Sequence, residues 1–260
     1  MTLELLVSAM YKEPLAQAQE MQIDSDAVIV SQGDHYDYQE LDYNGHKLRY
    51  FAMKERGVGL SRNHALMRAE ADIGLFADED IVYQPGYAEA VLKAFEEHPE
   101  ADMLLFNVKA MPGRETYHIS EFGRVRWYNC GRYSTYSCAV RIEKIHRHNI
   151  TFSLLFGGGA KYSNGEDSLF IQECIRKGLK VYKVPVQIGF ERERESTWFS
   201  GYHRKFFFDR GVLYRYMYGV MAKPFALRFL LAHKEQMCTE VSVKDAYRMM
   251  CEGITEASCK

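Results

Sequence analysis

The stretch IGLFADED, residues 73–80, decides the fold: five apolar or small residues run directly into three acids. Ile73 to Ala77 has the composition of a short buried strand, and open α/β sheets bind ligands at the carboxyl ends of such strands. Three adjacent carboxylates repel one another unless a cation compensates them. The stretch therefore predicts either a site for Mg²⁺ or Mn²⁺, which would bridge to substrate phosphates, or a solvated acidic turn.

Strand and helix patterns alternate on both sides of this stretch. Strands are expected at 3–8, 27–31, 49–51, 73–77, 103–108, 133–140 and 181–184, and helices at 15–21, 61–69, 87–97, 143–148 and 166–177, with Ser61 as a helix cap. Such alternation predicts an α/β domain with a mostly parallel sheet, interrupted by an antiparallel or irregular excursion at 110–123.

The pattern changes near residue 190. From about Trp198 the chain shows aromatic-rich helices, which we expect to be separated near Pro224 and His233. We therefore predict a Rossmann-like domain over residues 1–190 and a helical annex over 191–260.

Composition excludes several classes of protein. With 260 residues, 47% hydrophobic and 26% charged, the chain can bury a core, and a net charge of −2 argues against coating nucleic acid. Six scattered cysteines without a Cys-x-x-Cys pair indicate a reducing cytoplasm. The first residues lack a basic n-region, and no run reaches the ~18 apolar residues of a membrane span. We expect a cytoplasmic protein whose membrane contact, if any, is peripheral.

A second acidic segment is SNGEDSLF, residues 163–170, in which two acids open a helix. Carboxylates in a first turn are favoured by the helix dipole, so an ordinary N-terminal cap is one interpretation. The other is a general base, because a carboxylate fixed beside Gly157-Gly-Gly159 could accept a proton from a hydroxyl nucleophile.

Two further segments combine polar and basic residues. GLSRN, residues 59–63, either starts a capped surface helix or holds an anion through backbone N–H groups and Arg62. Residues 192–234 carry nine Lys and Arg against three acids, interleaved with aromatic residues. These could stack sugars or lie at an anionic membrane surface, or else the aromatic residues pack into the core, namely Trp198, Phe206, Phe207, Tyr214 and Phe229.

Taken in order, these segments resemble a family 2 glycosyltransferase with the GT-A fold over about residues 3–210. The resemblance rests on Gly59-Leu-Ser-Arg-Asn63, on Asp78-Glu-Asp80 as an Asp-x-Asp motif, on Gly165-Glu-Asp167 with Phe170, and on Ser196-Thr-Trp198-Phe199. No phosphate-loop, His-Glu-x-x-His or Gly-x-Ser-x-Gly motif competes with it.

The resemblance implies a role for each matching residue. Asp167 would be the catalytic base of an inverting displacement, with Glu166 and Trp198 on the acceptor side. Asp78 would contact the ribose or the metal, and Asp80 would bind Mn²⁺ or Mg²⁺, with His203 as an extra ligand. The donor-binding residues would be Ser8, Gln32, Asp34, Arg62, Asn63, Asp78 and Glu79.

The sequence departs from the family's pattern at two points. Many relatives have Asp-Asp where this chain has Ser31-Gln32, although a glutamine amide can still hydrogen-bond a base edge, so a UDP-sugar remains the expected donor. The Gln-x-x-Arg-Trp sequence of processive members is absent. We expect one sugar per visit, added to a glycan or lipid-linked acceptor in surface polysaccharide biosynthesis, at the cytoplasmic face of the membrane.

Two other functions stay open. A sugar nucleotidyltransferase would place a glycine-rich basic loop after the first strand, whereas Ser8 to Glu13 contains no glycine. A non-catalytic carbohydrate- or membrane-binding protein on the same fold would be indicated by loss of an acidic cluster, and both clusters are present.

Overall fold

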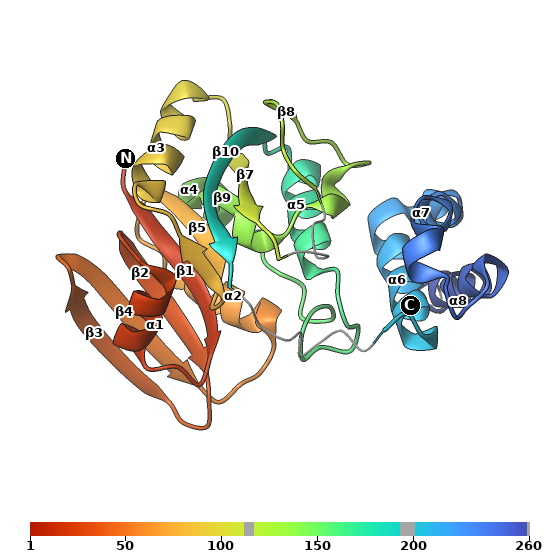
Figure 1. Cartoon of the computed structure of the whole chain (residues 1–260), viewed down its shortest axis with the longest axis horizontal. Coiled ribbons are helices and arrows are strands. Elements are labelled where there is room, and N and C mark those ends of the chain that lie inside the picture. The colour runs from red at the N-terminus through yellow and green to blue at the C-terminus, as the bar shows by residue number, and fades with distance from the viewer. Residues whose placement is uncertain (112–116, 193–200, 259–260) are drawn as a thin grey trace.

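The computed structural model describes residues 1–111, 117–192 and 201–258, and these form one central ten-stranded sheet with helices on both faces (Figure 1). The sheet order is β3-β4-β2-β1-β5-β9-β7-β10-β6, with β8 paired to β10. The run β4-β2-β1-β5 is parallel, as is β7 with β10, while β3, β9, β6 and β8 pair antiparallel. The strands are β1 Leu3–Met10, β2 Asp26–Gln32, β3 Asp37–Tyr43, β4 His46–Met53, β5 Ile73–Asp78, β6 Ile81–Tyr83, β7 Met103–Lys109, β8 Gly123–Arg124, β9 Cys138–Arg141 and β10 Val181–Glu191. The expected α/β class is confirmed.

The central strands β1, β2 and β5 are apolar on both faces, and helices cover both faces of the sheet. One core cluster joins Leu5 and Val7 of β1 to α1 (Pro14–Met21) and α3 (Tyr87–Glu97). The opposite cluster joins Leu6 of β1 and Phe76 of β5 to α2 (Val58–Arg68), α4 (Ile142–Arg147) and α5 (Glu166–Arg176). This explains why the strands appear in the sequence as continuous apolar runs.

Three helices follow β10 and lie together at the opposite end of the molecule from β3 (Figure 1). They are α6 (Arg204–Tyr218), α7 (Ala222–Met237) and α8 (Val243–Glu256). Helices α6 and α8 approach closely at two glycines: a Cβ on Gly211 would overlap the carbonyl oxygen of Met250, and one on Gly253 that of Phe208. Their apolar residues belong to the same core cluster as α5, so the helical annex packs on the sheet domain through a continuous core.

Several sequence-based expectations need correction. The cap of α2 is Gly57 rather than Ser61, which lies inside the helix. The expected break at Pro224 falls earlier, at Gly219 to Met221, because Gly219 adopts φ 55° and a proline is tolerated in the first turn of α7. No break occurs at His233, and α7 continues to Met237.

Two strand expectations also differ. The expected strand at 133–140 shortens to β9 because two 3₁₀ turns precede it, η1 (Cys130–Arg132) and η2 (Thr135–Ser137). Strand β3 was not expected, since its polar sequence is exposed at the sheet edge. Within the described residues, the cysteines are free thiols and no helix is long and apolar enough to cross a membrane.

Candidate active site

The carboxyl ends of β1, β2 and β5 bring three of the predicted donor-binding residues, Ser8, Gln32 and Asp78, to one edge of the sheet. Their parallel register places Ser8 opposite Asp78 and Met10 opposite Gln32. Residues separated by up to 70 positions in sequence therefore meet where a parallel sheet ordinarily binds its ligand.

Arg62 is the centre of this edge. Its side chain is buried, with Nη2 2.8 Å from Asp78 Oδ1 and Nη1 2.8 Å from Asp167 Oδ1 and 3.1 Å from Glu166 Oε1. One guanidinium thus joins the acid at the end of β5 to both acids at the start of α5. The two acidic segments that the sequence singled out form a single cluster.

Helix α2 is fixed so that Arg62 points into this cluster. The Asn63 side chain donates to the carbonyl of Phe152 and accepts from its N–H, at 3.0 and 2.7 Å. Gly59 allows close packing there, since a Cβ would lie 2.6 Å from the Ser153 carbonyl oxygen. Ser61 shares a hydrogen bond of 2.8 Å with Ser8. Both polar atoms of the Asn63 amide are engaged in this way, and its role in donor binding stays a prediction.

Gln32 holds the start of the same helix. Its Oε1 accepts a hydrogen bond of 2.6 Å from the N–H of Gly57, which adopts φ 135° as the N-cap residue of α2. Gln32 itself is buried. The sequence had suggested that Gln32 contacts a nucleotide base; its observed partner is the backbone of α2, and the base contact stays a prediction.

Glu166 is the buried acid of the cluster. Burial is the main cause that raises its pKa, to about 7 from an ordinary 4.5, and the neighbouring charge of Asp167 acts in the same direction, while Arg62 opposes both. Gly157 makes room for this side chain, since a Cβ there would lie 2.8 Å from the Glu166 carboxyl carbon.

Asp167 is more open and has a second partner that the sequence did not reveal. Thr135 of η2 donates its hydroxyl to Asp167 Oδ1, the same oxygen that Arg62 contacts. No motif marks Thr135, because it lies in an irregular segment and reaches Asp167 only through the tertiary fold. Among the described residues, both contacts use this one oxygen, Oδ1, and leave Oδ2 available to a ligand.

Glu79 and Asp80 continue from β5. Glu79 is buried and its carboxylate accepts from the N–H of Met10 at 2.8 Å, which ties β1 to β5. Asp80 is partly exposed, and its carbonyl oxygen accepts from the N–H of Arg192 at 2.8 Å. In the described part of the chain, no three His, Cys, Asp or Glu side chains are grouped to hold a metal ion.

The remaining predicted residues lie away from the cluster or outside the described part. Asp34 is exposed and contacts His35 at 2.8 Å, and that hydrogen bond lowers the pKa of Asp34. His203 is exposed at the start of α6. Trp198, with the segment 196–199, lies outside the described residues. The roles assigned to these residues stay predictions.

Comparison with known proteins gives a family match over part of the chain. Residues 31–149, which include Arg62, Asp78, Asp80 and Thr135, match the model of glycosyl transferase family 2. Comparison with curated proteins gives no match.

Solved glycosyltransferase structures share the fold. S. aureus TarS 1–349 in complex with UDP-GlcNAc superposes with a TM-score of 0.65 and 15% identity, over 99% of this chain and 80% of that one. The mannosyltransferase PcManGT from Pyrobaculum calidifontis, in complex with GDP-Man and Mn²⁺, gives a TM-score of 0.55 and 12% identity, over 99% and 75% of the two chains. The chain has the GT-A fold, as its sequence led us to expect.

Proposed function

We propose that this chain is an inverting, non-processive family 2 glycosyltransferase. It would transfer one sugar from a nucleotide-sugar donor to a hydroxyl of a glycan or lipid-linked acceptor. The observation that carries the proposal is the contact of Arg62 with Asp78 on one side and with Glu166 and Asp167 on the other. In this arrangement the end of β5, where the Asp-x-Asp motif begins, lies beside the partly exposed carboxylate of Asp167, which supports the proposal of metal-assisted sugar transfer.

The proton transfer in this proposal belongs to Asp167. Its carboxylate takes the proton of the acceptor hydroxyl, the hydroxyl oxygen forms a bond to the anomeric carbon, and the bond from that carbon to the nucleoside diphosphate breaks. A single displacement inverts the anomeric configuration. Arg62 and Thr135 hold one oxygen of Asp167 and leave the other for the acceptor.

The oxygen donors at the end of β5 fit Mn²⁺ or Mg²⁺. Mg²⁺ on a nucleotide is ordinarily held by one or two carboxylates and the substrate's phosphates, so a preformed cage of protein ligands is not required. Asp80, which is partly exposed, and Asp78 would hold the ion, with His203 as a further ligand. When bound, the metal would neutralise charge on the departing diphosphate.

Donor and acceptor identities extend the proposal. A UDP-sugar is the first choice, supported by the UDP-GlcNAc complex of TarS, and a GDP-sugar is the alternative suggested by PcManGT. We assign residues 1–190 to donor binding and catalysis, and 191–260 to the acceptor or membrane-surface side. The reaction would take place in the cytoplasm, at the inner face of the membrane, in surface polysaccharide biosynthesis.

The test is a panel of uridine, guanosine, thymidine and cytidine nucleotide sugars, each with Mn²⁺, Mg²⁺ or chelator. We expect one nucleotide class to raise the unfolding temperature only when metal is present. At a donor concentration of 100 times Kd, the expected stabilisation is about 2.7 kcal/mol. Slow release of the nucleoside diphosphate should accompany it.

The variant Asp167→Asn separates binding from chemistry. It should keep the stabilisation by the donor and lose donor hydrolysis by about 10²–10⁴-fold, because a base contributes roughly that factor. Asp245→Asn, at a partly exposed acid on α8, is the matched control. Hydrolysis by Asp167→Asn at the wild-type rate would show that another group is the base. If no nucleotide sugar stabilised the protein with any metal, a non-catalytic binding protein would become the better interpretation.

A further inference from the structure

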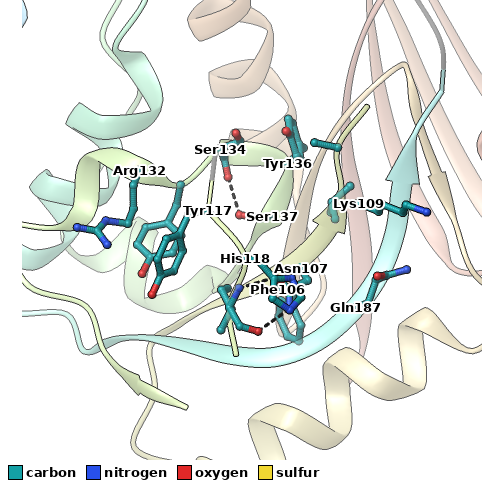
Figure 2. A pocket seen from close by; sticks show the side chains of 14 residues that line it. Phe106, Asn107, Lys109, Tyr117, His118, Arg132, Ser134, Tyr136, Ser137 and Gln187 are labelled. Carbon is teal, nitrogen blue, oxygen red and sulfur yellow. Dashed lines mark hydrogen bonds between the residues drawn. The ribbon is translucent and has the colours of Figure 1, made fainter. Parts of the chain in front are cut away.

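A cavity of about 210 Å³ opens beside the candidate active site, at the carboxyl end of β7 (Figure 2). Two of its lining residues are held together by hydrogen bonds, because the Asn107 side chain donates to the carbonyl of Ile119 and accepts from its N–H, both at 2.9 Å. Tyrosine rings line the walls, namely Tyr117, Tyr133 and Tyr136. A volume of this size with aromatic walls is suited to one sugar unit, whose CH face packs on aromatic rings.

The charge of this cavity is one-sided. Its lining includes Lys109, His118 and Arg132 and no Asp or Glu. Among the described residues, none of these three basic side chains forms an ion pair with a carboxylate. Figure 2 shows Arg132 beside Tyr117 on one side of the cavity and Lys109 on the other, and the Arg132 guanidinium lies over the Tyr117 ring at 4.9 Å.

The described acids near the cavity leave its net charge positive. The amine of Lys183 donates to the Tyr117 hydroxyl at 3.1 Å, just outside the lining, and lies 3.7 Å from Glu121. Glu191 is a second acid nearby among the described residues, and its two oxygens accept from the Tyr136 hydroxyl at 2.7 Å and from the N–H of Met111 at 3.1 Å. Among the described residues, the cations of the cavity lining outnumber Glu191, which contacts the cavity through Tyr136, and a net positive charge favours an anionic ligand.

The turn η2 connects this cavity to the candidate base. Thr135 faces Asp167, whereas its neighbours Ser134, Tyr136 and Ser137 line the cavity. In the sheet, β9 and β7 lie on one side of β5, and β1 and β2, which carry Ser8 and Gln32, lie on the other. The cavity is therefore separated from the predicted donor residues by the strand that ends in Asp78.

We infer that this cavity binds an anionic sugar unit of the acceptor, one that carries a phosphate ester or a carboxylate. The inference rests on the proposed function, since it takes Asp167 as the base that the acceptor must reach. The tyrosine walls contact the sugar, and Lys109, His118 and Arg132 select its charge. The acceptor of this enzyme is then a charged glycan rather than a neutral one.

The inference is tested by calorimetric titration of the full chain with glucose, glucose 6-phosphate, glucuronate and inorganic phosphate. We expect at least one charged sugar to bind ten or more times tighter than glucose, and phosphate alone to bind more weakly than the phosphorylated sugar. Comparison of glucose 6-phosphate with glucuronate identifies which anion the cavity prefers. Equal affinity for charged and neutral sugars, or no measurable binding of any charged sugar, would overturn the inference.

A double variant links binding to this cavity. Lys109→Gln with Arg132→Gln should weaken binding of the preferred charged sugar about tenfold or more. The control is Lys93→Gln with Arg147→Gln, which removes the same charge from exposed positions on α3 and α4 and should leave this affinity unchanged. Unfolding temperatures of both variants verify that they are folded. If the cavity variant bound like the control, the ligand would lie elsewhere and the inference would be wrong. Donor hydrolysis by the wild type is measured in a separate experiment. Absence of hydrolysis would refute the proposed function, while the sugar titration would still report on the cavity.

Discussion

Glu166→Gln should make the protein more stable than the wild type as pH rises. In the folded chain, burial raises the pKa of Glu166 to about 7, so the side chain keeps its proton to a higher pH than in the unfolded chain, where the value is near 4.5. Between these values the folded state binds more protons than the unfolded state, and the free energy of unfolding therefore falls as pH rises. Glutamine has the same shape and does not ionise.

The magnitude follows from the two pKa values. Each unit corresponds to about 1.4 kcal/mol, so a rise from 4.5 to about 7 amounts to about 3 kcal/mol. The side chain is 11% exposed, so solvent screening reduces this figure only slightly. The variant and the wild type should have the same free energy of unfolding below pH 4.5. Between pH 4.5 and 7 the variant should become the more stable of the two, and above pH 7 the difference should stay constant at about 3 kcal/mol.

The assay is urea unfolding of both proteins at half-unit steps from pH 4.5 to 8.5. Taking the difference at each pH cancels the titration of other groups. Glu173→Gln is the control, because it makes the same chemical change on the same helix at a partly exposed position that pairs with Lys177. Parallel stability curves for Glu166→Gln and the wild type across this range would refute the reasoning.

Three more predictions test the remaining contacts. Thr135→Val should lower the rate of donor hydrolysis, because the Asp167 carboxylate loses a hydrogen bond that orients it, and Thr135→Ser should restore the rate; a wild-type rate in Thr135→Val would exclude this positioning role. Gly211→Ala should destabilise the protein by about 1–3 kcal/mol in urea unfolding, since its methyl group must push α8 away from Met250, and a neutral effect would contradict the close approach. Asp80→Ala should weaken Mn²⁺-dependent donor binding about tenfold or more in thermal-shift titrations, and wild-type donor affinity of the variant with Mn²⁺ would argue against the role of Asp80 as a metal ligand.

The sheet was largely predictable because its strands are buried on both faces and are read as apolar runs. Ile73 to Ala77 needs no tertiary information to be assigned, and the same holds for the helix over 87–97, whose bounds the structure reproduces. Strand β3 escaped notice because an exposed edge strand requires no apolar residues. The expected break at His233 was wrong since that residue has no property that ends a helix.

The site was predictable in its composition and much less in its contacts. The sequence singled out Arg62, Asp78, Glu166 and Asp167, yet nothing in it shows that one guanidinium touches all three acids. Burial of Glu166 was equally hidden, since an acid in a first turn is ordinarily a solvated cap. Thr135 and the basic cavity could not be found, because both depend on how the irregular segment before β9 folds back on the sheet.

The charge balance of the cluster unites these observations. When ionised, Asp78, Glu166 and Asp167 carry three negative charges against the one positive charge of Arg62, and in the described structure their ion pairs go to no other Lys or Arg. The raised pKa of Glu166 relieves part of this excess by retaining a proton near neutrality. A donor diphosphate would bring further negative charge to an edge that is already negative, and Coulomb repulsion in a partly buried site is strong. A divalent cation, if held by Asp80, would offset that repulsion, which is a physical reason, independent of any resemblance, to expect that donor binding depends on metal.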